Sequence, residues 1–394
     1  MAGINRTTGK ATDLITFSRA SGGTYLDSDG LLKTASTNIP RIEYAADGTV
    51  KGLLIEEART NLLTYSEDFT NASWITGGLN SVVSSDTSIS PDGNTNADTL
   101  SVDSVGGTAG TVGVAKAITV STSTAYTASV FAKADQSNFL ALGVVALTTP
   151  ANGDVWFDLA NGTVGTSASG LSGSIQSLGS GWYRCSMTFT TDAADTSGQL
   201  RIYLGNADGG STITRDGTSS VYLYGAQFEA GSFPTSYIPT SGATATRAAD
   251  IASISVDSFG YRQDAGTVVV DVNTFDTDYS NWVWVLDGTS GTSLYGYSAA
   301  NGWRVFGSGG TVAYLGSLPA NADAKIGYAY SNAGSAALID GGSVGTEPHS
   351  QPVAVTTIRL GAASASSAFL NGHIKSIQYL PRRLSDAQLQ ALTA

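Results

Sequence analysis

The chain has 394 residues, of which 41% are hydrophobic and 13% are charged, against about 25% charged in an ordinary globular protein. Its net charge of −12 excludes an ordinary nucleic-acid binder, which needs basic surface to neutralise phosphates, and disfavours an anionic membrane. The length allows two or three domains. The single cysteine, Cys185, excludes an intrachain disulfide and a cysteine-rich metal site, and we expect it to be buried.

The first 60 residues combine short strand-like pieces with turn signals. The pieces are 14–17, 42–44 and 53–55. Three short strands make a poor independent core, so we predict that residues 1–60 form an arm or attachment segment that packs on a neighbour or on the next domain. The N-terminus lacks the apolar core of a signal peptide, and no run of about 18 apolar residues occurs. We therefore expect a protein made in a cytoplasm, with no membrane insertion.

Residues 61–245 are predicted to form one β-sandwich. Residues 125–134 alternate Tyr126, Ala128, Val130 and Ala132 with more polar positions, which is the period of two that a strand requires. Many short strands at regular spacing are typical of a sandwich or jelly roll. The expected strands are 113–120, 125–134, 139–147, 154–159, 182–190, 199–204 and 220–229.

A small, uncharged linker at 240–246 precedes a second predicted sandwich over residues 250–394. At its end, Ser385 is a plausible N-cap followed by good helix formers, which predicts a short helix over 385–392. The fold class is therefore all-β, with two jelly-roll sandwiches in tandem. The expected strands are 250–255, 266–272, 282–286, 293–297, 303–306, 325–330, 335–339, 357–360 and 373–379.

Two stretches, GLLIEEARTNLLTYSEDFTNASW at 52–74 and YLYGAQFEAGSFPTSYIPTSGATATRAAD at 222–250, bracket the first predicted sandwich. Together they resemble a module of tailed-bacteriophage virion proteins that is related to carbohydrate-binding modules. The resemblance covers roughly residues 50–250 and is specific at its two ends. The structural calcium of that family uses a Glu and an Asp where this chain has Thr70 and Tyr224. We therefore expect no metal and no cofactor, with Glu67, Asp68 and Glu229 as weak substitutes.

The last part of the chain reads LNGHIKSIQYLPRRLS at 370–385. It resembles the closing strand of concanavalin-like, laminin-G-type jelly rolls, followed by Pro-Arg and a short helix as in phage fibre and spike proteins. This resemblance covers about 260–394. It implies a lectin-like role for the second sandwich.

Aromatic side chains are the candidates for stacking on sugar rings. Most are expected in the cores, because large aromatics dominate buried area; these are Trp74, Trp182, Trp282 and Trp284. Trp303 follows the turn signal Asn301-Gly302, and Tyr295 and Tyr297 flank Gly296. If the second sandwich has a glycan platform, we expect it at Trp303, Tyr295 and Tyr297.

No motif in the chain predicts catalysis. Glycoside hydrolysis needs two facing carboxylates, and Glu56-Glu57 are adjacent, so a surface ion pair with Arg59 is the more ordinary expectation. The only histidines, His349 and His373, lie in no nucleophile-elbow motif. We expect no enzyme activity.

The sequence therefore favours a bacteriophage virion protein, such as a tail fibre, spike or head spike, that recognises a host surface polysaccharide. Its expected partners are other virion proteins and that polysaccharide, and a homo-oligomer, with a trimer favoured, follows from phage fibres in general. The alternative is a capsid decoration, cement or tail scaffold protein with a purely structural role. A depolymerase is a third hypothesis, for which the sequence offers no convincing carboxylate pair.

Overall fold

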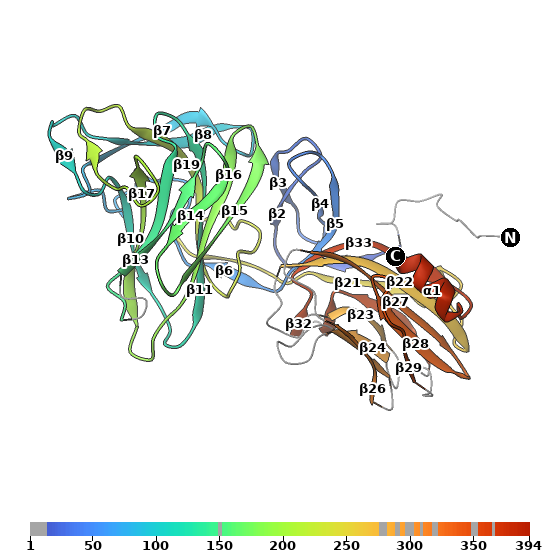
Figure 1. The fold of residues 1–394 in the computed structure, drawn as a ribbon. Coiled ribbons are helices and arrows are strands. Elements are labelled where there is room, and N and C mark those ends of the chain that lie inside the picture. Colours follow the sequence, from blue (N-terminus) through green and yellow to red (C-terminus); the bar gives the residue numbers. More distant parts are fainter. Residues whose placement is uncertain are drawn as a thin grey trace.

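The computed structural model describes residues 14–148, 152–275, 282–287, 292–295, 303–307, 310–316, 322–347, 354–364 and 367–394. Two β-sandwiches stand side by side, with a short helix near the C-terminus (Figure 1). All strand pairs are antiparallel within the described residues. The prediction of an all-β chain with two sandwiches and a C-terminal helix is confirmed.

The first sandwich consists of a five-stranded and a six-stranded sheet. The five-stranded sheet has the order β10 (Gly113–Thr119), β17 (Ser197–Gly205), β12 (Phe139–Val145), β13 (Asn152–Asp158), β14 (Thr163–Ser167). The six-stranded sheet has the order β15 (Leu171–Gly179), β16 (Trp182–Thr190), β11 (Ala125–Ala134), β19 (Ser220–Ala230), β8 (Thr95–Val102), β7 (Ser81–Ile89).

Apolar side chains from the inner faces of these two sheets form the core of the first sandwich. Phe69 and Trp74 belong to this core, with ring centroids 5.0 Å apart. Cys185 is fully buried in this core, and burial raises the pKa of its thiol. The expectations that Trp74, Trp182 and Cys185 are buried are therefore confirmed.

The second sandwich consists of two seven-stranded sheets. One has the order β1 (Thr16–Ser18), β21 (Ile251–Ser255), β30 (Thr357–Leu360), β23 (Trp282–Asp287), β24 (Thr292–Tyr295), β25 (Trp303–Gly307), β26 (Gly310–Gly316). The other has the order β29 (Gly345–Glu347), β28 (Gly334–Ile339), β27 (Asp323–Ser331), β22 (Ala265–Thr274), β33 (Gly372–Leu380), β5 (Val50–Ile55), β4 (Ile42–Tyr44). Trp284 is fully buried in the core between them, whereas Trp282 is half-buried.

The described part of the N-terminal segment, residues 14–60, does not form a separate arm, because three of its strands complete the second sandwich. β1 pairs with β21, and β5 pairs with both β33 and β4, so the segment contributes to both sheets. Leu53 and Ile55 of β5 belong to the core of that sandwich. Gly52 permits the close approach of β5 to β33, since a Cβ there would lie 2.4 Å from the Ile374 carbonyl oxygen. Local patterns missed this pairing, because the partners lie more than 300 residues apart.

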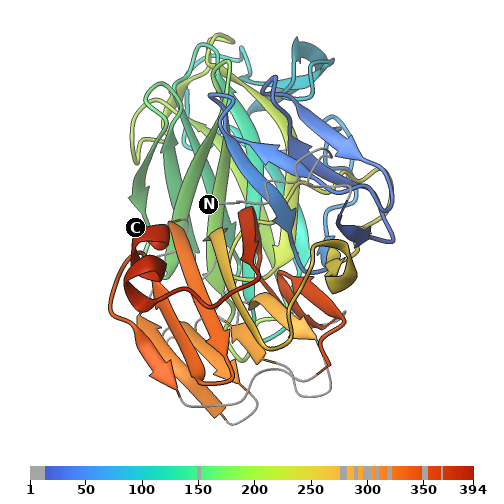
Figure 2. The same ribbon diagram turned by 90° about the vertical axis from the view of Figure 1, so that its right-hand side faces the viewer.

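The first sandwich is thus inserted between β5 and β21 of the second. The chain leaves through β6 (Arg59–Asn61) and returns through β20 (Ala245–Arg247), and these two strands pair with each other. The hairpin of β2 (Gly23–Leu26) and β3 (Leu32–Ala35) lies beside the first sandwich and above the second, among the strands drawn in blue (Figures 1 and 2). Leu26 of this hairpin packs with Phe131, Trp182 and Tyr237 of the first sandwich.

The remaining elements are small. A 3-10 turn covers Val256–Ser258, and two short pairs join β9 (Thr108–Ala109) to β18 (Ile213–Thr214) and β31 (Ala362–Ser364) to β32 (Ser367–Phe369). Helix α1 (Asp386–Thr393) begins at a capping box of Ser385 and Gln388, and its Leu389 packs on β22, β27 and β28. Within the described residues, no helix has the length and apolar character that a membrane span requires.

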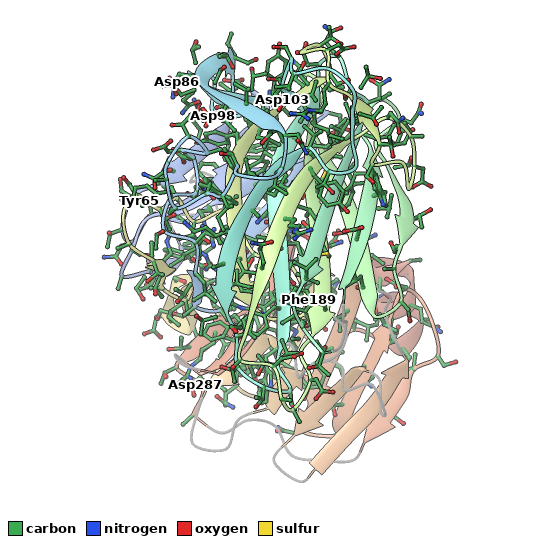
Figure 3. The ribbon with its side chains drawn as sticks, turned by 90° about the vertical axis from the view of Figure 1, so that its left-hand side faces the viewer. Tyr65, Asp86, Asp98, Asp103, Phe189 and Asp287 are labelled. Atoms are coloured by element: carbon green, nitrogen blue, oxygen red, sulfur yellow. The ribbon has the colours of Figure 1, made fainter. Side chains whose placement is uncertain are left out.

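Asp98 of β8 connects the loop that contains Phe69 to an irregular part of β7. It is 1% exposed and accepts the backbone N–H of Phe69 (2.9 Å) and of Asp86 (3.1 Å). Figure 3 shows Asp98 beside Asp86 at the end of the molecule remote from Asp287. Burial raises the pKa of Asp98 from its ordinary 3.8 to about 6, although the two N–H donors act in the opposite direction.

Acidification is therefore expected to stabilise the first sandwich between about pH 6 and pH 4. Because the folded pKa of Asp98 is raised, its contribution is fully present below pH 3.8 and is lost as the pH rises through about 6. Through Asp98, the free energy of unfolding should be about 3 kcal/mol higher below pH 3.8 than well above pH 6. Hydrogen exchange of β8 peptides against pH should show this rise in the wild type and not in Asp98→Asn. Equal pH dependence in both proteins would contradict the assignment.

Candidate ligand-binding cleft between the two sandwiches

A cleft of about 770 Å³ lies between the two sandwiches and the β4–β5 hairpin. Its first wall is the outer face of β15 and β16, whose side chains there are hydroxyl, amide and guanidinium groups. Antiparallel register sets them out as three cross-strand pairs, which are Ser172 with Thr188, Ser174 with Ser186, and Gln176 with Arg184. The opposite faces of these strands supply Cys185, Met187 and Phe189 to the core. Successive side chains of a strand point to opposite faces of the sheet, so β16 presents polar groups to the cleft and apolar groups to the core.

The second wall is the outer face of the β5, β33, β22 and β27 sheet. Its residues also lie in register, because Leu54 pairs with His373, His373 with Asn273, and Asn273 with Asp323. These four neighbours span three strand spacings, about 14 Å at 4.8 Å each. Asn273 Nδ2 donates to Asp323 Oδ1 at 3.2 Å. The two walls therefore offer rows of hydrogen-bonding groups to whatever enters between them.

Glu43 and His373 form the most buried charged contact of the second wall. Glu43 Oε2 lies 2.6 Å from His373 Nε2 and 3.8 Å from Lys51 Nζ. The His373 side chain is 2% exposed. Burial opposes ionisation of Glu43, but the hydrogen bond and charge of His373 outweigh it, so the pKa of Glu43 is lowered. Glu43 is thus held as a carboxylate.

Aromatic groups from both sandwiches meet at this cleft. Phe233, in the loop after β19, and Phe275, at the end of β22, have ring centroids 6.4 Å apart. Phe275 also contacts the His373 ring edge to face at 5.1 Å. The Arg59 guanidinium also lies against Phe233, 4.9 Å from the centre of its ring. The cleft thus combines aromatic surface with polar walls, as sites for small polar ligands commonly do.

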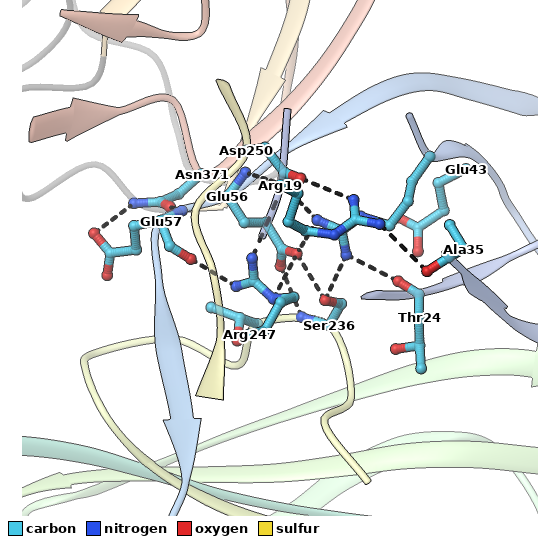
Figure 4. Close-up of polar contacts among 12 residues, drawn as sticks. Arg19, Thr24, Ala35, Glu43, Glu56, Glu57, Ser236, Arg247, Asp250 and Asn371 are labelled. Atoms are coloured by element: carbon cyan, nitrogen blue, oxygen red, sulfur yellow. Dashed lines mark hydrogen bonds and ion pairs between the residues drawn. The ribbon is translucent and has the colours of Figure 1, made fainter. Parts of the chain in front are cut away.

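A buried ionic network at the neck of the inserted sandwich holds the two walls in place (Figure 4). Arg41 binds Glu56 (2.7 Å) and Asp250 (2.5 Å), and Arg19 binds Asp250 (3.0 Å). Arg247 lies 3.5 Å from Glu56. All five side chains are at most 1% exposed.

The same network reaches the loop that lines the cleft. The backbone N–H and the hydroxyl of Ser236 both donate to Glu56 at 2.7 Å. Ser236 belongs to the 232–236 loop, which carries Phe233 into the cleft. Glu56 therefore connects the N-terminal segment, the neck and the cleft.

Two of the three predicted platform residues lie on strands of the other sheet of the second sandwich. Tyr295 ends β24 and Trp303 begins β25, which are neighbouring strands of the other sheet of the second sandwich. Tyr297 lies outside the described residues. The sheet of β24 and β25 is not the one that forms the second wall of the cleft, and the role of the three residues in glycan binding stays a prediction.

One other expectation is corrected by the geometry. Glu57 pairs with Arg59 at 2.5 Å as expected, but Glu56 turns inward to the buried network instead of joining a surface pair. His373 lines the cleft, whereas His349 lies outside the described residues.

The weak calcium substitutes do not gather into a cluster. Glu67 accepts hydrogen bonds from Tyr224 (3.1 Å) and Tyr237 (3.0 Å), whereas the buried Glu229 is bonded to Gln227 and Thr235. No group of three or more His, Cys, Asp or Glu side chains suited to a metal ion occurs in the described part of the chain.

The cleft was not predicted from the sequence, although part of its lining belongs to the stretches 52–74, 222–250 and 370–385. Ser172, Ser174 and Gln176 alternate with Gly173 and Ile175, and this period of two was the available signal for the first wall. The second wall depends on pairing between strands from distant parts of the chain. No local pattern could have revealed it.

No protein-family model and no curated protein matches the sequence. Among solved structures, the LG1-3 region of the laminin alpha2 chain aligns over 74% of this chain and 63% of its own, with 10% identity and a TM-score of 0.25. The mouse laminin alpha1 chain, domains LG4-5, aligns over 82% of this chain and 94% of its own, with 11% identity and a TM-score of 0.24. The chain spans less than two thirds of the first of these structures. Likeness at this level carries no argument, and the β-sandwich assignment rests on the sheets themselves.

Proposed function

We propose that this chain is a non-catalytic polysaccharide-binding protein and that the cleft between the two sandwiches holds the glycan. The observation that carries the proposal is the pair of facing walls next to Phe233 and Phe275. One wall has hydroxyl, amide and guanidinium groups in cross-strand register, and the other has imidazole, amide and carboxylate groups. Sugars expose many hydroxyl groups that both donate and accept hydrogen bonds, together with apolar ring faces. Walls of mixed donors and acceptors beside aromatic surface suit that chemistry.

The setting that we propose is a bacteriophage virion, where the chain serves as a tail fibre, spike or head spike. The support is the resemblance of 52–74, 222–250 and 370–385 to phage virion modules. We favour a trimer as the arrangement of the copies. Each site would bind weakly, but several sites on one particle would raise the overall avidity, because the first contact raises the effective concentration of the ligand at the others. In this setting the other partners are virion proteins, and the ligand is a polysaccharide of the host surface.

The charges in the cleft support binding without hydrolysis. A glycosidase acid needs a carboxyl whose pKa is raised, whereas the pKa of Glu43 is lowered. Glu43 lies on β4 and Asp323 on β27, four strand spacings or about 19 Å apart in the sheet. That separation exceeds the 6.5–9.5 Å of an inverting pair.

The alternative function is a capsid decoration, cement or tail scaffold protein whose sandwiches only pack and protect. The buried network at the neck favours it, because a fixed orientation of the sandwiches suits a structural element. Removal of such a protein would weaken the particle mechanically and leave adsorption intact.

Binding of the purified protein to capsule and lipopolysaccharide fractions of candidate hosts tests the proposal. We expect saturable binding that Gln176→Ala and Asn273→Ala each weaken by about two- to tenfold, the value of one or two neutral hydrogen bonds. Gln378→Ala is the matched control, since Gln378 lies on β33 but outside the cleft. Loss of binding in Trp303→Ala alone would move the site to the predicted platform. No binding to any fraction would favour the structural alternative.

A further inference from the structure

Arg184 is a cation in the cleft wall that forms no ion pair with any described residue. Its Nε and Nη2 donate to Ser129 Oγ at 3.3 and 3.0 Å, and its Nη1 donates to the Thr235 carbonyl at 2.6 Å. No carboxylate within the described chain lies within ion-pair distance of it, unlike the arginines of the neck. A guanidinium has five N–H donors, so three bonds leave two of them for a ligand.

The position of Arg184 is fixed and partly dehydrated. Its guanidinium lies 5.5 Å from the centre of the Phe131 ring, which covers one side. Burial lowers the pKa of Arg184, although the charges of Glu229, Glu56 and Glu43 act in the opposite direction. Buried charges are normally paired, because an unpaired one is costly to remove from water. An anion that entered the cleft would supply the missing partner.

The described carboxylates of the cleft all have partners of their own, and two lysines lie in the same lining. Each described carboxylate there already accepts a hydrogen bond or lies in an ion pair. Glu43 is bonded to His373, Glu56 to Arg41, Asp47 to the Thr49 N–H and Asp323 to Asn273. Lys51 and Lys375 are held loosely, at 3.8 Å from Glu43 and 3.5 Å from Asp323.

We propose that the glycan of this cleft is anionic and that Arg184 binds its carboxylate or phosphate group, with Lys51 and Lys375 as outer contacts. This inference rests on the proposed polysaccharide function and specifies its ligand. The fork of an arginine suits the planar carboxylate of a uronic or sialic acid and the oxygens of a phosphodiester. Gln176, the cross-strand neighbour of Arg184, and Ser174 and Ser186 next to them offer hydrogen bonds to the sugar hydroxyls.

The test compares matched ligands on the full-length protein. The probes are oligosaccharides that contain hexuronate, sialate or phosphodiester groups, each beside a neutral counterpart made by carboxyl reduction or dephosphorylation. We expect binding of at least one acidic member, a loss of about ten- to a hundredfold in its neutral counterpart, and a similar loss in Arg184→Gln. Arg184→Lys should retain part of the affinity. Lys51→Gln with Lys375→Gln should weaken binding by only a fewfold, because exposed charges contribute little.

Arg184→Gln could weaken binding only because it disturbs the 232–236 loop. The lysine variants test the anionic ligand independently of that loop, since neither lysine is bonded to it. Salt should weaken binding of the acidic probe more than binding of a neutral one. Equal affinity for acidic and neutral partners, with no effect of Arg184→Gln or the lysine pair, would overturn the anionic ligand and leave polysaccharide binding standing. Absence of binding to every probe would overturn the proposed function itself.

Discussion

A chain that begins at residue 58 is expected to lose the second sandwich and to keep the first. Such a chain lacks β1, β4 and β5, and β5 lies between β33 and β4 within one sheet. Leu53, Leu54 and Ile55 of β5 are each at most 4% exposed, and burial of three such side chains is worth about 6 kcal/mol. A domain is stable by only about 5–15 kcal/mol in total. Hydrogen exchange should show protection lost across 250–394 and retained across 61–245.

The matched protein removes the inserted sandwich instead. β6 and β20 pair in register, with Asn61 opposite Ala245, so a two-residue Asn-Gly turn can join them as a hairpin. A chain of residues 1–61, Asn-Gly and 245–394 is expected to fold, with protected amides in β22 and β33. It loses the two hydrogen bonds from Ser236 to Glu56, so its stability should fall by a few kcal/mol without loss of the fold. A folded 58–394 second sandwich, or an unfolded hairpin-joined chain, would contradict the inserted arrangement.

Local sequence patterns predicted the strands that are strongly apolar or bounded by clear turns. β11, β16 and β30 match the expected ranges, and Ser385 correctly marked the helix. β7 and β15 were missed because they are rich in Ser and much of their surface faces solvent. β8 is largely buried and was missed because five of its eight residues are polar. Their pairing with neighbouring strands supplies the order that their own composition does not indicate.

The arrangement of the domains depended on contacts that no local pattern contains. The pairing of β5 with β33 joins residues near 54 and 373, and the network joins Arg19 to Asp250. From the sequence, Glu56 was expected at the surface because two adjacent glutamates beside an arginine are ordinary surface features. Its burial becomes intelligible only when Arg41 and Arg247 are brought to it by the fold.

The substitution Glu56→Gln is expected to destabilise the second sandwich and its neck by about 3–5 kcal/mol. Glu56 is fully buried, lies within ion-pair distance of Arg41 and Arg247, and accepts two hydrogen bonds from Ser236. Loss of its charge leaves three buried arginines with Asp250 as their remaining carboxylate in this network, and an uncompensated buried charge carries a cost of that size. The change is measured by unfolding the protein in guanidinium chloride and monitoring hydrogen exchange of the β5 and β21 amides. Glu57→Gln is the matched control, since Glu57 is one-third exposed and its pair with Arg59 should contribute less than about 1 kcal/mol.

The pH dependence separates the charge of Glu56 from its shape. Burial opposes its ionisation, but Arg247, Arg41 and Ser236 outweigh burial and hold the pKa of Glu56 well below its usual range. Because the folded pKa is lowered, this stabilisation is present above the unfolded value of about 4.3 and is lost as the pH falls further. Below about pH 4 the wild type should therefore lose stability in β5 and β21. The Glu56→Gln protein should lose less over the same pH range, because it has no carboxylate at this position to protonate. Parallel curves for the two proteins would show that the neck does not depend on the charge of Glu56.

The first sandwich should meanwhile gain stability between about pH 6 and 4 through Asp98. Acid is therefore expected to weaken the neck while the inserted sandwich stays folded.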